Sequence, residues 1–124
     1  MNPWVLLAAA AAGGVGAGLR YIVDVLVVAD KPGRLTAGIL VVNSTGSFAL
    51  GVLTGLGVSL LAGEAAWIVG VGLLGGYTTF STVSMESVLL IRSGEQRRGW
   101  LNAAGTLVLG VAAAAAGLAI GQLF

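Results

Sequence analysis

The residues best suited to chemistry lie in one short stretch that follows two glycines, Gly75 and Gly76. This stretch carries five hydroxyl side chains, which can donate hydrogen bonds without adding charge: Thr78, Thr79, Ser81, Thr82 and Ser84. The glycines and threonines are poor helix formers. A helix break here would free backbone carbonyls for a hard cation and backbone amides for an anion. A kinked packing helix is the alternative, but the coincidence of break and hydroxyls favours a functional site.

A second polar feature precedes this stretch, in a segment that carries no charge. Helical spacing places four of its polar residues near one face: Thr36, Asn43, Ser47 and Thr54. Hydrogen bonds between helices, worth about 0.6 kcal/mol each, would explain a single asparagine. A stripe of four is at least as compatible with a polar track for a hydrophilic solute.

Three charged residues fall inside apolar segments. Arg20 and Asp24 are four residues apart, and we expect them to pair on one helix. Both could instead extend to the membrane surface. Glu86 is a functional candidate because carboxylates inside a membrane are costly. It could bind a proton or cation, or accept hydrogen bonds and orient a donor network; we favour the second role.

The composition shows what kind of element must position these residues. Of the 124 residues, 57% are hydrophobic and 9% are charged, against roughly 25% charged in soluble domains. The mean hydropathy is +1.01. A disordered chain and a soluble domain are therefore excluded, and an integral membrane protein remains. The chain has no Cys and no His, which excludes thiolate or histidine metal sites and the commonest general base, so no enzyme is expected.

Four segments are long enough to cross a bilayer, which takes about 20 apolar residues each. We expect spans at about 4–29, 35–62, 65–91 and 99–124, within one domain that covers 1–124. Lipid permits only helices or closed barrels, and four spans cannot close a barrel. The prediction is an all-α integral membrane four-helix bundle with a broken third helix. Each span also carries a GxxxG pair, which favours close helix packing and an oligomer: Gly14/Gly18, Gly51/Gly55, Gly72/Gly76 and Gly117/Gly121.

Loop charges predict the orientation in the membrane. The first and third loops share one side and hold five cations: Lys31, Arg34, Arg92, Arg97 and Arg98. The opposite side holds no Lys or Arg. The positive-inside rule therefore places both termini outside.

Three blocks of the sequence closely resemble the Fluc (CrcB-type) fluoride ion channels. They are Gly13-Gly14-Val15-Gly16-Ala17 with Arg20-Tyr21, then Val42-Asn43-Ser44-Thr45-Gly46-Ser47-Phe48, then Gly72-Leu73-Leu74-Gly75-Gly76-Tyr77-Thr78-Thr79-Phe80-Ser81-Thr82. The fourth segment resembles the family only in its hydrophobicity. The resemblance implies a passive, fluoride-selective channel in the bacterial inner membrane that exports fluoride from the cytoplasm. It also implies an antiparallel, dual-topology dimer with two pores.

The resemblance assigns roles to individual residues. Asn43 would be the pore-lining amide, Phe80 would present its ring edge to the ion, and Ser81 and Thr82 would continue the polar track. Arg20 would lie near the pore mouth. A structural sodium ion, which is not transported, would be held at the dimer centre by the backbone carbonyls of Gly75 and Thr78.

The sequence departs from the family in two places. Val83 stands where the family usually has a second Phe, so one pore could be impaired or another side chain could substitute. The fourth segment lacks a tyrosine that many members carry. Together with the one-sided charges, Val83 leads us to expect a heterodimer with an oppositely oriented paralogue, with an antiparallel homodimer as the alternative.

Two other functions compete. A small proton-coupled exporter of the multidrug-resistance type has a similar size, but it needs a central glutamate on the first helix, where this chain offers only Asp24. A non-transporting membrane subunit would pack through its GxxxG faces and conduct no ions.

Overall fold

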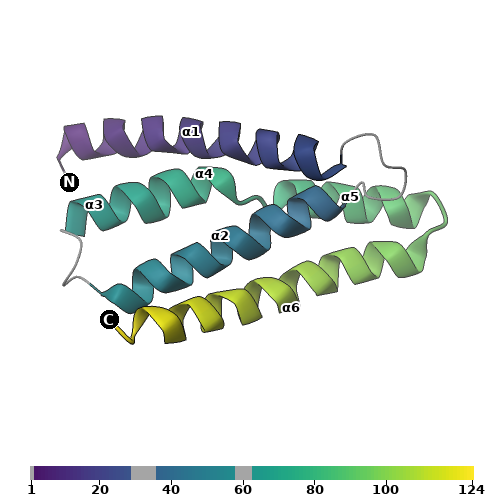
Figure 1. The fold of residues 1–124 in the computed structure, drawn as a ribbon. Coiled ribbons are helices and arrows are strands. Elements are labelled where there is room, and N and C mark those ends of the chain that lie inside the picture. Colours follow the sequence, from purple (N-terminus) through teal and green to yellow (C-terminus); the bar gives the residue numbers. More distant parts are fainter. Residues whose placement is uncertain (1, 29–35, 58–62) are drawn as a thin grey trace.

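Four long helical spans make up the part of the chain that the computed structural model describes, residues 2–28, 36–57 and 63–124. The first span is α1 (Pro3–Val28), the second is α2 (Ala37–Leu56) and the fourth is α6 (Gln96–Gly121). The third runs from Gly63 to Arg92 in several pieces. All secondary structure in the described residues is helical, and both ends of the chain lie at the same end of the bundle (Figure 1). The predicted all-α membrane bundle is confirmed.

The second helix is shorter than the sequence predicts. It begins at Ala37 and ends at Leu56, whereas the apolar segment suggested 35–62. Gly57 ends it with a φ of 66°, a left-handed conformation that favours glycine, and its N–H donates to the Thr54 carbonyl. The predicted first loop, with Lys31 and Arg34, lies outside the described residues, as do residues 58–62.

The third span is broken, as predicted. Its pieces are α3 (Gly63–Trp67), the π-helical segment η1 (Ile68–Leu74), α4 (Gly75–Tyr77) and α5 (Ser81–Arg92). The helix leaves its path at Thr78, whose φ of −79° and ψ of 156° are extended (Figure 1). The break therefore follows the glycine pair, although the sequence suggested that the glycines themselves would break the helix.

Gly76 stays helical, and its lack of a side chain permits close packing between α4 and α1. A Cβ at Gly76 would overlap the carbonyl of Gly13 on α1, and one at Gly72 would meet the backbone of Ala9. Gly16 on α1 faces the carbonyl of Leu73 in the same way. These contacts bring η1 and α4 against α1, where any side chain would separate the backbones.

The two halves of the broken span pack on different neighbours. While η1 and α4 lie on α1, α5 lies on α6 (Figure 1). At the second contact a Cβ on Gly99 would meet the Ser87 carbonyl and the Ile91 side chain. The break is thus the point where the span passes from one packing partner to the other.

The glycine pairs of α2 and α6 pack against each other, as their spacing predicts. A Cβ at Gly51 would overlap the Ala114 carbonyl, and one at Gly117 would overlap the Phe48 carbonyl. The Gly14/Gly18 pair of α1 behaves differently, because a Cβ added at either glycine would have no described atom within 4 Å. On α1, Gly13 and Gly16 make the close contacts with the third span instead.

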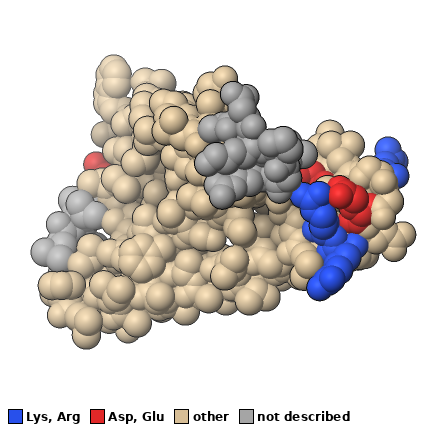
Figure 2. Space-filling view, turned by 45° about the vertical axis from the view of Figure 1, so that its right-hand side comes forward, with Lys and Arg blue, Asp and Glu red and all other residues tan. Residues whose placement is uncertain are grey.

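Three arginines near the turn between α5 and α6 lie at the end of the bundle opposite the termini. Figure 2 shows Arg atoms in blue at this end, beside acidic atoms in red. The described cations here are Arg92, at the end of α5, and Arg97 and Arg98, in the first turn of α6. Most of the remaining surface is apolar, which suits contact with lipid.

Candidate functional site: a polar pocket at the helix break

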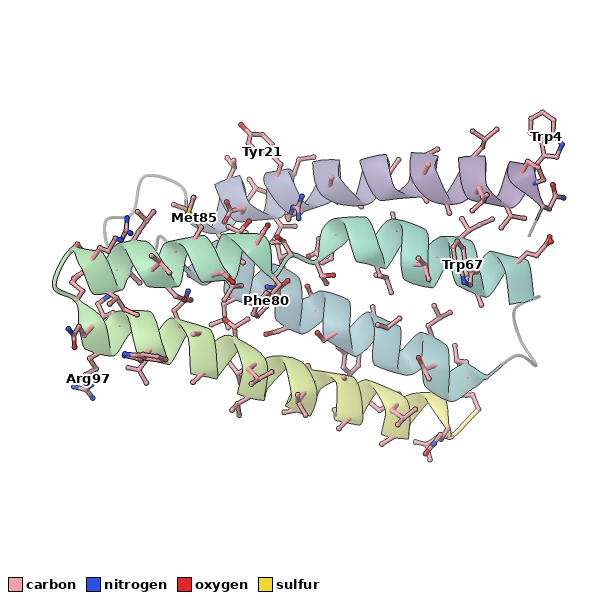
Figure 3. The ribbon with its side chains drawn as sticks, turned by 180° about the vertical axis from the view of Figure 1, so that it is seen from behind. Trp4, Tyr21, Trp67, Phe80, Met85 and Arg97 are labelled. Atoms are coloured by element: carbon pink, nitrogen blue, oxygen red, sulfur yellow. The ribbon has the colours of Figure 1, made fainter. Side chains whose placement is uncertain are left out.

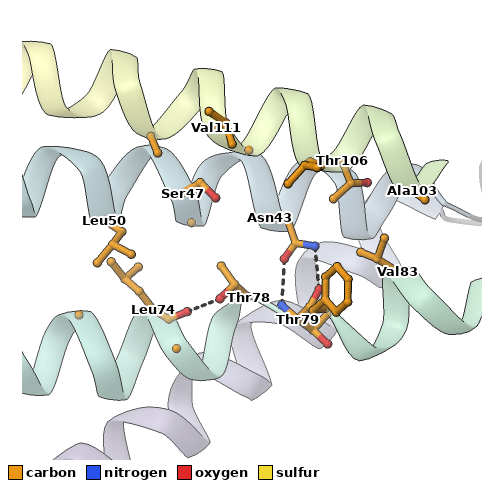
Figure 4. Close-up of a pocket in the computed structure, with 17 residues that line it drawn as sticks. Asn43, Ser47, Leu50, Leu74, Thr78, Thr79, Val83, Ala103, Thr106 and Val111 are labelled. Atoms are coloured by element: carbon orange, nitrogen blue, oxygen red, sulfur yellow. Dashed lines mark hydrogen bonds between the residues drawn. The ribbon is translucent and has the colours of Figure 1, made fainter. Parts of the chain in front are cut away.

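Asn43 joins α2 to the break in the third span. Its Nδ2 donates to the Thr79 carbonyl at 2.8 Å, and the Thr79 N–H donates back to Asn43 Oδ1 at 2.9 Å (Figure 4). In a continuous helix that N–H would instead donate to the carbonyl of Gly75. Asn43 is only 9% exposed, so these bonds satisfy polar groups that would otherwise be buried without partners.

The hydroxyl of Thr79 organises the start of α5. Its Oγ1 accepts the N–H of Thr82 at 3.4 Å, in the manner of an N-cap residue. It also lies 3.0 Å from Ser81 Oγ and 3.4 Å from Thr82 Oγ1. The predicted hydroxyl run is therefore a connected cluster around Thr79. Thr78 and Ser84 stand apart, because their hydroxyls donate to carbonyls of their own segments, Leu74 and Phe80.

A pocket of about 620 Å³ opens between α2, the break and α6 (Figure 4). Apolar side chains form most of its wall, and no charged residue in the described segments lines it. Its polar groups come from three elements: Asn43 and Ser47 on α2, Thr78 and Thr79 at the break, and Thr106 on α6. A few convergent polar groups in an apolar cavity are typical of a small-solute site.

Phe80 and Val83 line the same pocket with very different exposure. Phe80 is 80% exposed and lies where α4 gives way to α5 (Figure 3). Val83 is 2% exposed, and its carbonyl accepts the Ser87 hydroxyl at 2.7 Å. Phe80 is thus the one aromatic residue among the described residues that line this pocket.

Thr106 is a pocket residue that reasoning from the sequence missed. Its Oγ1 is buried without a hydrogen-bond partner among the residues that the structure describes. A signal was present in the sequence: Asn102 and Thr106 are four residues apart, and they are the only amide or hydroxyl side chains between Gly99 and Gly121. That spacing places both on one face of α6.

The other predicted pore residues are distributed around the break. Ser81 is exposed and Thr82 partly buried; neither lines the pocket, but both lie within hydrogen-bonding distance of Thr79. Of the stripe on α2, Thr36 lies in a separate hollow and Thr54 is exposed, with its hydroxyl donating to the Leu50 carbonyl.

Arg20 reaches the break from α1. Its NH1 donates to the Thr78 carbonyl at 3.3 Å. That carbonyl lacks its usual helical donor, because the Thr82 N–H is directed to Thr79 Oγ1. The expected Arg20–Asp24 pair is therefore wrong: Asp24 Oδ1 is buried with no hydrogen-bond partner in the described ranges.

Glu86 also differs from its expected role. Its Oε2 is buried without a hydrogen-bond partner in the parts of the chain that are described. It does not accept hydrogen bonds from the hydroxyl cluster, so it does not orient that cluster. The cluster is oriented by Thr79 and Asn43 instead.

The backbone carbonyls predicted to hold sodium have suitable chemistry. The Gly75 carbonyl has lost the Thr79 N–H to Asn43, and carbonyl oxygens can replace the hydration shell of a monovalent cation. The Thr78 carbonyl has two lone pairs, one of which accepts from Arg20. No group of three or more acidic, His or Cys residues in the described segments could offer a different metal site. The sodium site stays a prediction.

Four membrane-crossing helices, one of them broken beside a polar pocket, define a multi-pass helical membrane protein. Residues 7–118 match the family described as "CrcB-like protein, Camphor Resistance (CrcB)", and the chain belongs to this family.

Curated relatives carry the names of ion channels, in agreement with a protein that is not an enzyme. The "Fluoride-specific ion channel FluC 1" of Leifsonia xyli subsp. xyli is 41% identical over 124 residues, covering 99% of this chain and 90% of its own. The "Fluoride-specific ion channel FluC" of Shewanella woodyi is 44% identical over 105 residues, covering 84% and 85%. That of Shewanella halifaxensis is 45% identical over 98 residues, covering 78% and 79%.

Proposed function

We propose that this protein is a passive, fluoride-selective channel that exports fluoride from the bacterial cytoplasm across the inner membrane and so lowers its toxicity. The observation that carries the proposal is the uncharged pocket at the helix break, where amide and hydroxyl groups converge from three elements. The names of the curated relatives support fluoride as the ion.

The chemistry of the pocket suits a small anion that holds its water tightly. Removing that water in hydrocarbon is very costly unless other donors replace it. The amide of Asn43 has two N–H groups, of which one donates to Thr79 and the other is available to an ion. The hydroxyls of Ser47 and Thr106 add further donors. Since none of these is charged, the ion is held weakly enough to leave, as conduction requires.

Phe80 contributes through the positive edge of its ring, which can face an anion without binding it strongly. Ser81 and Thr82 continue the path beyond the pocket, because their hydroxyls belong to the same cluster as Thr79. Arg20 lies on α1, on the other side of the break, and stabilises the break by donating to the Thr78 carbonyl. The carbonyls of Gly75 and Thr78 would hold the structural sodium ion, which would supply positive charge beside the anion path.

A second subunit completes the pore in this proposal. Phe80 and Ser81 are exposed at mid-span, where a single chain would leave them in lipid. Gly14 and Gly18 offer an unoccupied close-packing face on α1. The subunits are antiparallel, and the five loop cations on one side favour an oppositely oriented paralogue as the partner. An antiparallel homodimer remains the alternative.

Fluoride efflux from liposomes tests the proposal. Purified protein, alone and with any neighbouring paralogue, is reconstituted, and a fluoride electrode follows efflux after valinomycin is added to relieve the membrane potential. We expect fluoride efflux that needs valinomycin and no efflux of chloride. Efflux driven only by a pH gradient would instead indicate a proton-coupled exporter. A protein that conducts nothing in either preparation would be a non-transporting subunit.

A further inference from the structure

A second hollow lies nearer the basic end of the bundle, and we call it the mouth pocket. It has a volume of about 280 Å³ and lies between α2, α5 and α6. Three of its lining residues are polar, Thr36, Arg98 and Asn102, and the others are Leu40, Leu90, Leu101 and Gly105. Neither the family comparison nor the names of the relatives assign a role to it.

The mouth pocket lies in line with the main pocket. On α6, Asn102 and Gly105 of the mouth pocket are adjacent in sequence to Ala103 and Thr106 of the main pocket. On α2, Leu40 lies one turn before Asn43. The two hollows therefore follow the same groove, and the mouth pocket extends it toward the cations.

A polar contact separates the two pockets. Asn102 Nδ2 donates to Ser87 Oγ at 3.0 Å and approaches the Val83 carbonyl at 3.5 Å. Ser87 is 5% exposed, and it lies between Val83 of the main pocket and Leu90 of the mouth pocket. An anion that passes between the pockets would therefore meet an amide and a hydroxyl rather than hydrocarbon alone.

Arg98 gives the mouth pocket a fixed positive group. Its NH1 lies 2.8 Å from Glu95 Oε1, with both side chains nearly half exposed. Such an exposed ion pair is weak, and it orients the guanidinium without cancelling its positive charge. The Thr36 hydroxyl makes no capping bond to α2, although Thr36 occupies the N-cap position.

We propose that the mouth pocket binds a small inorganic anion before it reaches the main pocket. Arg98 attracts the anion, and the Thr36 hydroxyl offers a hydrogen-bond donor. The volume holds an anion with several waters, each of which occupies about 30 Å³ in the liquid. This inference rests on the proposed channel function and adds to it a site at which the anion is collected.

The test compares Arg98→Gln with Arg97→Gln in the liposome assay. Arg97 is the matched control, because it precedes Arg98 in the first turn of α6, does not line the mouth pocket and points away from the bundle (Figure 3). At low ionic strength we expect Arg98→Gln to slow fluoride efflux about tenfold, an effect of the size that electrostatic attraction has on association rates. We expect Arg97→Gln to change the efflux rate less than about twofold. Salt near 1 M, where the screening length is about 3 Å, should remove most of the difference. Glu95→Gln should raise efflux at low salt, because it removes the negative charge that faces Arg98.

Each other outcome has a definite meaning. Equal efflux in the two arginine variants would overturn the anion site in the mouth pocket but not the channel function. A loss of efflux in Arg98→Gln that does not change with salt would do the same. The assay is repeated in neutral phosphatidylcholine and in vesicles with anionic lipid. If the loss occurs only with anionic lipid, Arg98 binds lipid headgroups, and the anion site is overturned. A wild-type protein that passes no fluoride overturns the channel and the mouth pocket together.

Discussion

Asn43 and Thr79 exchange two hydrogen bonds, of 2.8 and 2.9 Å, across the boundary between the second span and the break in the third. One side chain thereby replaces the backbone partner that a continuous helix would provide. The pair sets the shape of the pocket, since both residues line it. It also explains why the break is tolerated at this depth, where lipid offers no hydrogen bonds.

The first prediction concerns this pair. Asn43→Asp removes the donor to the Thr79 carbonyl and places a fixed negative charge in the anion path. We expect fluoride efflux to fall at least about a hundredfold, since an unpaired buried charge costs about 3–5 kcal/mol. Efflux from liposomes with equal amounts of wild-type and variant protein measures the effect. Undiminished efflux would remove Asn43 from the pore.

The second prediction concerns Thr106. Thr106→Val keeps the shape of the side chain but removes the buried hydroxyl, which has no hydrogen-bond partner among the described residues, so a passing anion loses one donor. We expect efflux to fall about tenfold, because a hydrogen bond to a charged group contributes about 1.5–3 kcal/mol. Folding should be unaffected, since the described residues lose no hydrogen bond.

Thr54→Val is the matched control for Thr106→Val. The Thr54 hydroxyl donates to its own helix at the Leu50 carbonyl, and the residue lies outside both pockets. We expect its efflux to equal that of the wild type. A similar loss in the two variants would show that hydroxyl removal acts on helix packing rather than on the anion path.

The sequence predicts the presence of the break more accurately than its position. Two glycines and two threonines in close succession give this stretch a low helix propensity. Gly76 nevertheless stays helical, and it is needed for the contact with Gly13. That contact depends on how α1 packs, which local propensity cannot show. The same limit applies to Arg20: the four-residue spacing suggests Asp24 as its partner, but the Thr78 carbonyl becomes available only once the break has formed.

The candidate site could be predicted to a different extent on each helix. Asn43 stands out in an uncharged span, and the structure places it in the pocket with Phe80. Its two bonds to Thr79 join positions 36 residues apart, and no local pattern encodes that pairing. Thr106 escapes prediction because one hydroxyl in an apolar span is weak evidence until α6 is known to face the break.

The third prediction concerns the contact between α1 and the third span. Gly76→Ala places a methyl group against the Gly13 carbonyl, so we expect overpacking to cost about 1–3 kcal/mol, more than alanine gains in helix propensity. A lower midpoint of thermal unfolding in detergent would reveal this cost. Gly63→Ala is the control, because no described atom lies within 4 Å of a Cβ there. Its midpoint should be unchanged or slightly higher; an equal drop in both variants would contradict the packing role of Gly76.

The last prediction concerns orientation. The chain has no cysteine, so Asn2→Cys and Ser93→Cys each introduce a single label site, one at each end of the bundle. Because the loop cations favour one side, we expect a membrane-impermeant maleimide added to intact cells to label Asn2→Cys and to spare Ser93→Cys until the membrane is permeabilised. Replacing Arg92, Arg97 and Arg98 with Gln should weaken this preference, since only two loop cations would remain. Labelling of both sites in intact cells would show dual topology, and the antiparallel homodimer would then replace the heterodimer as the proposed assembly.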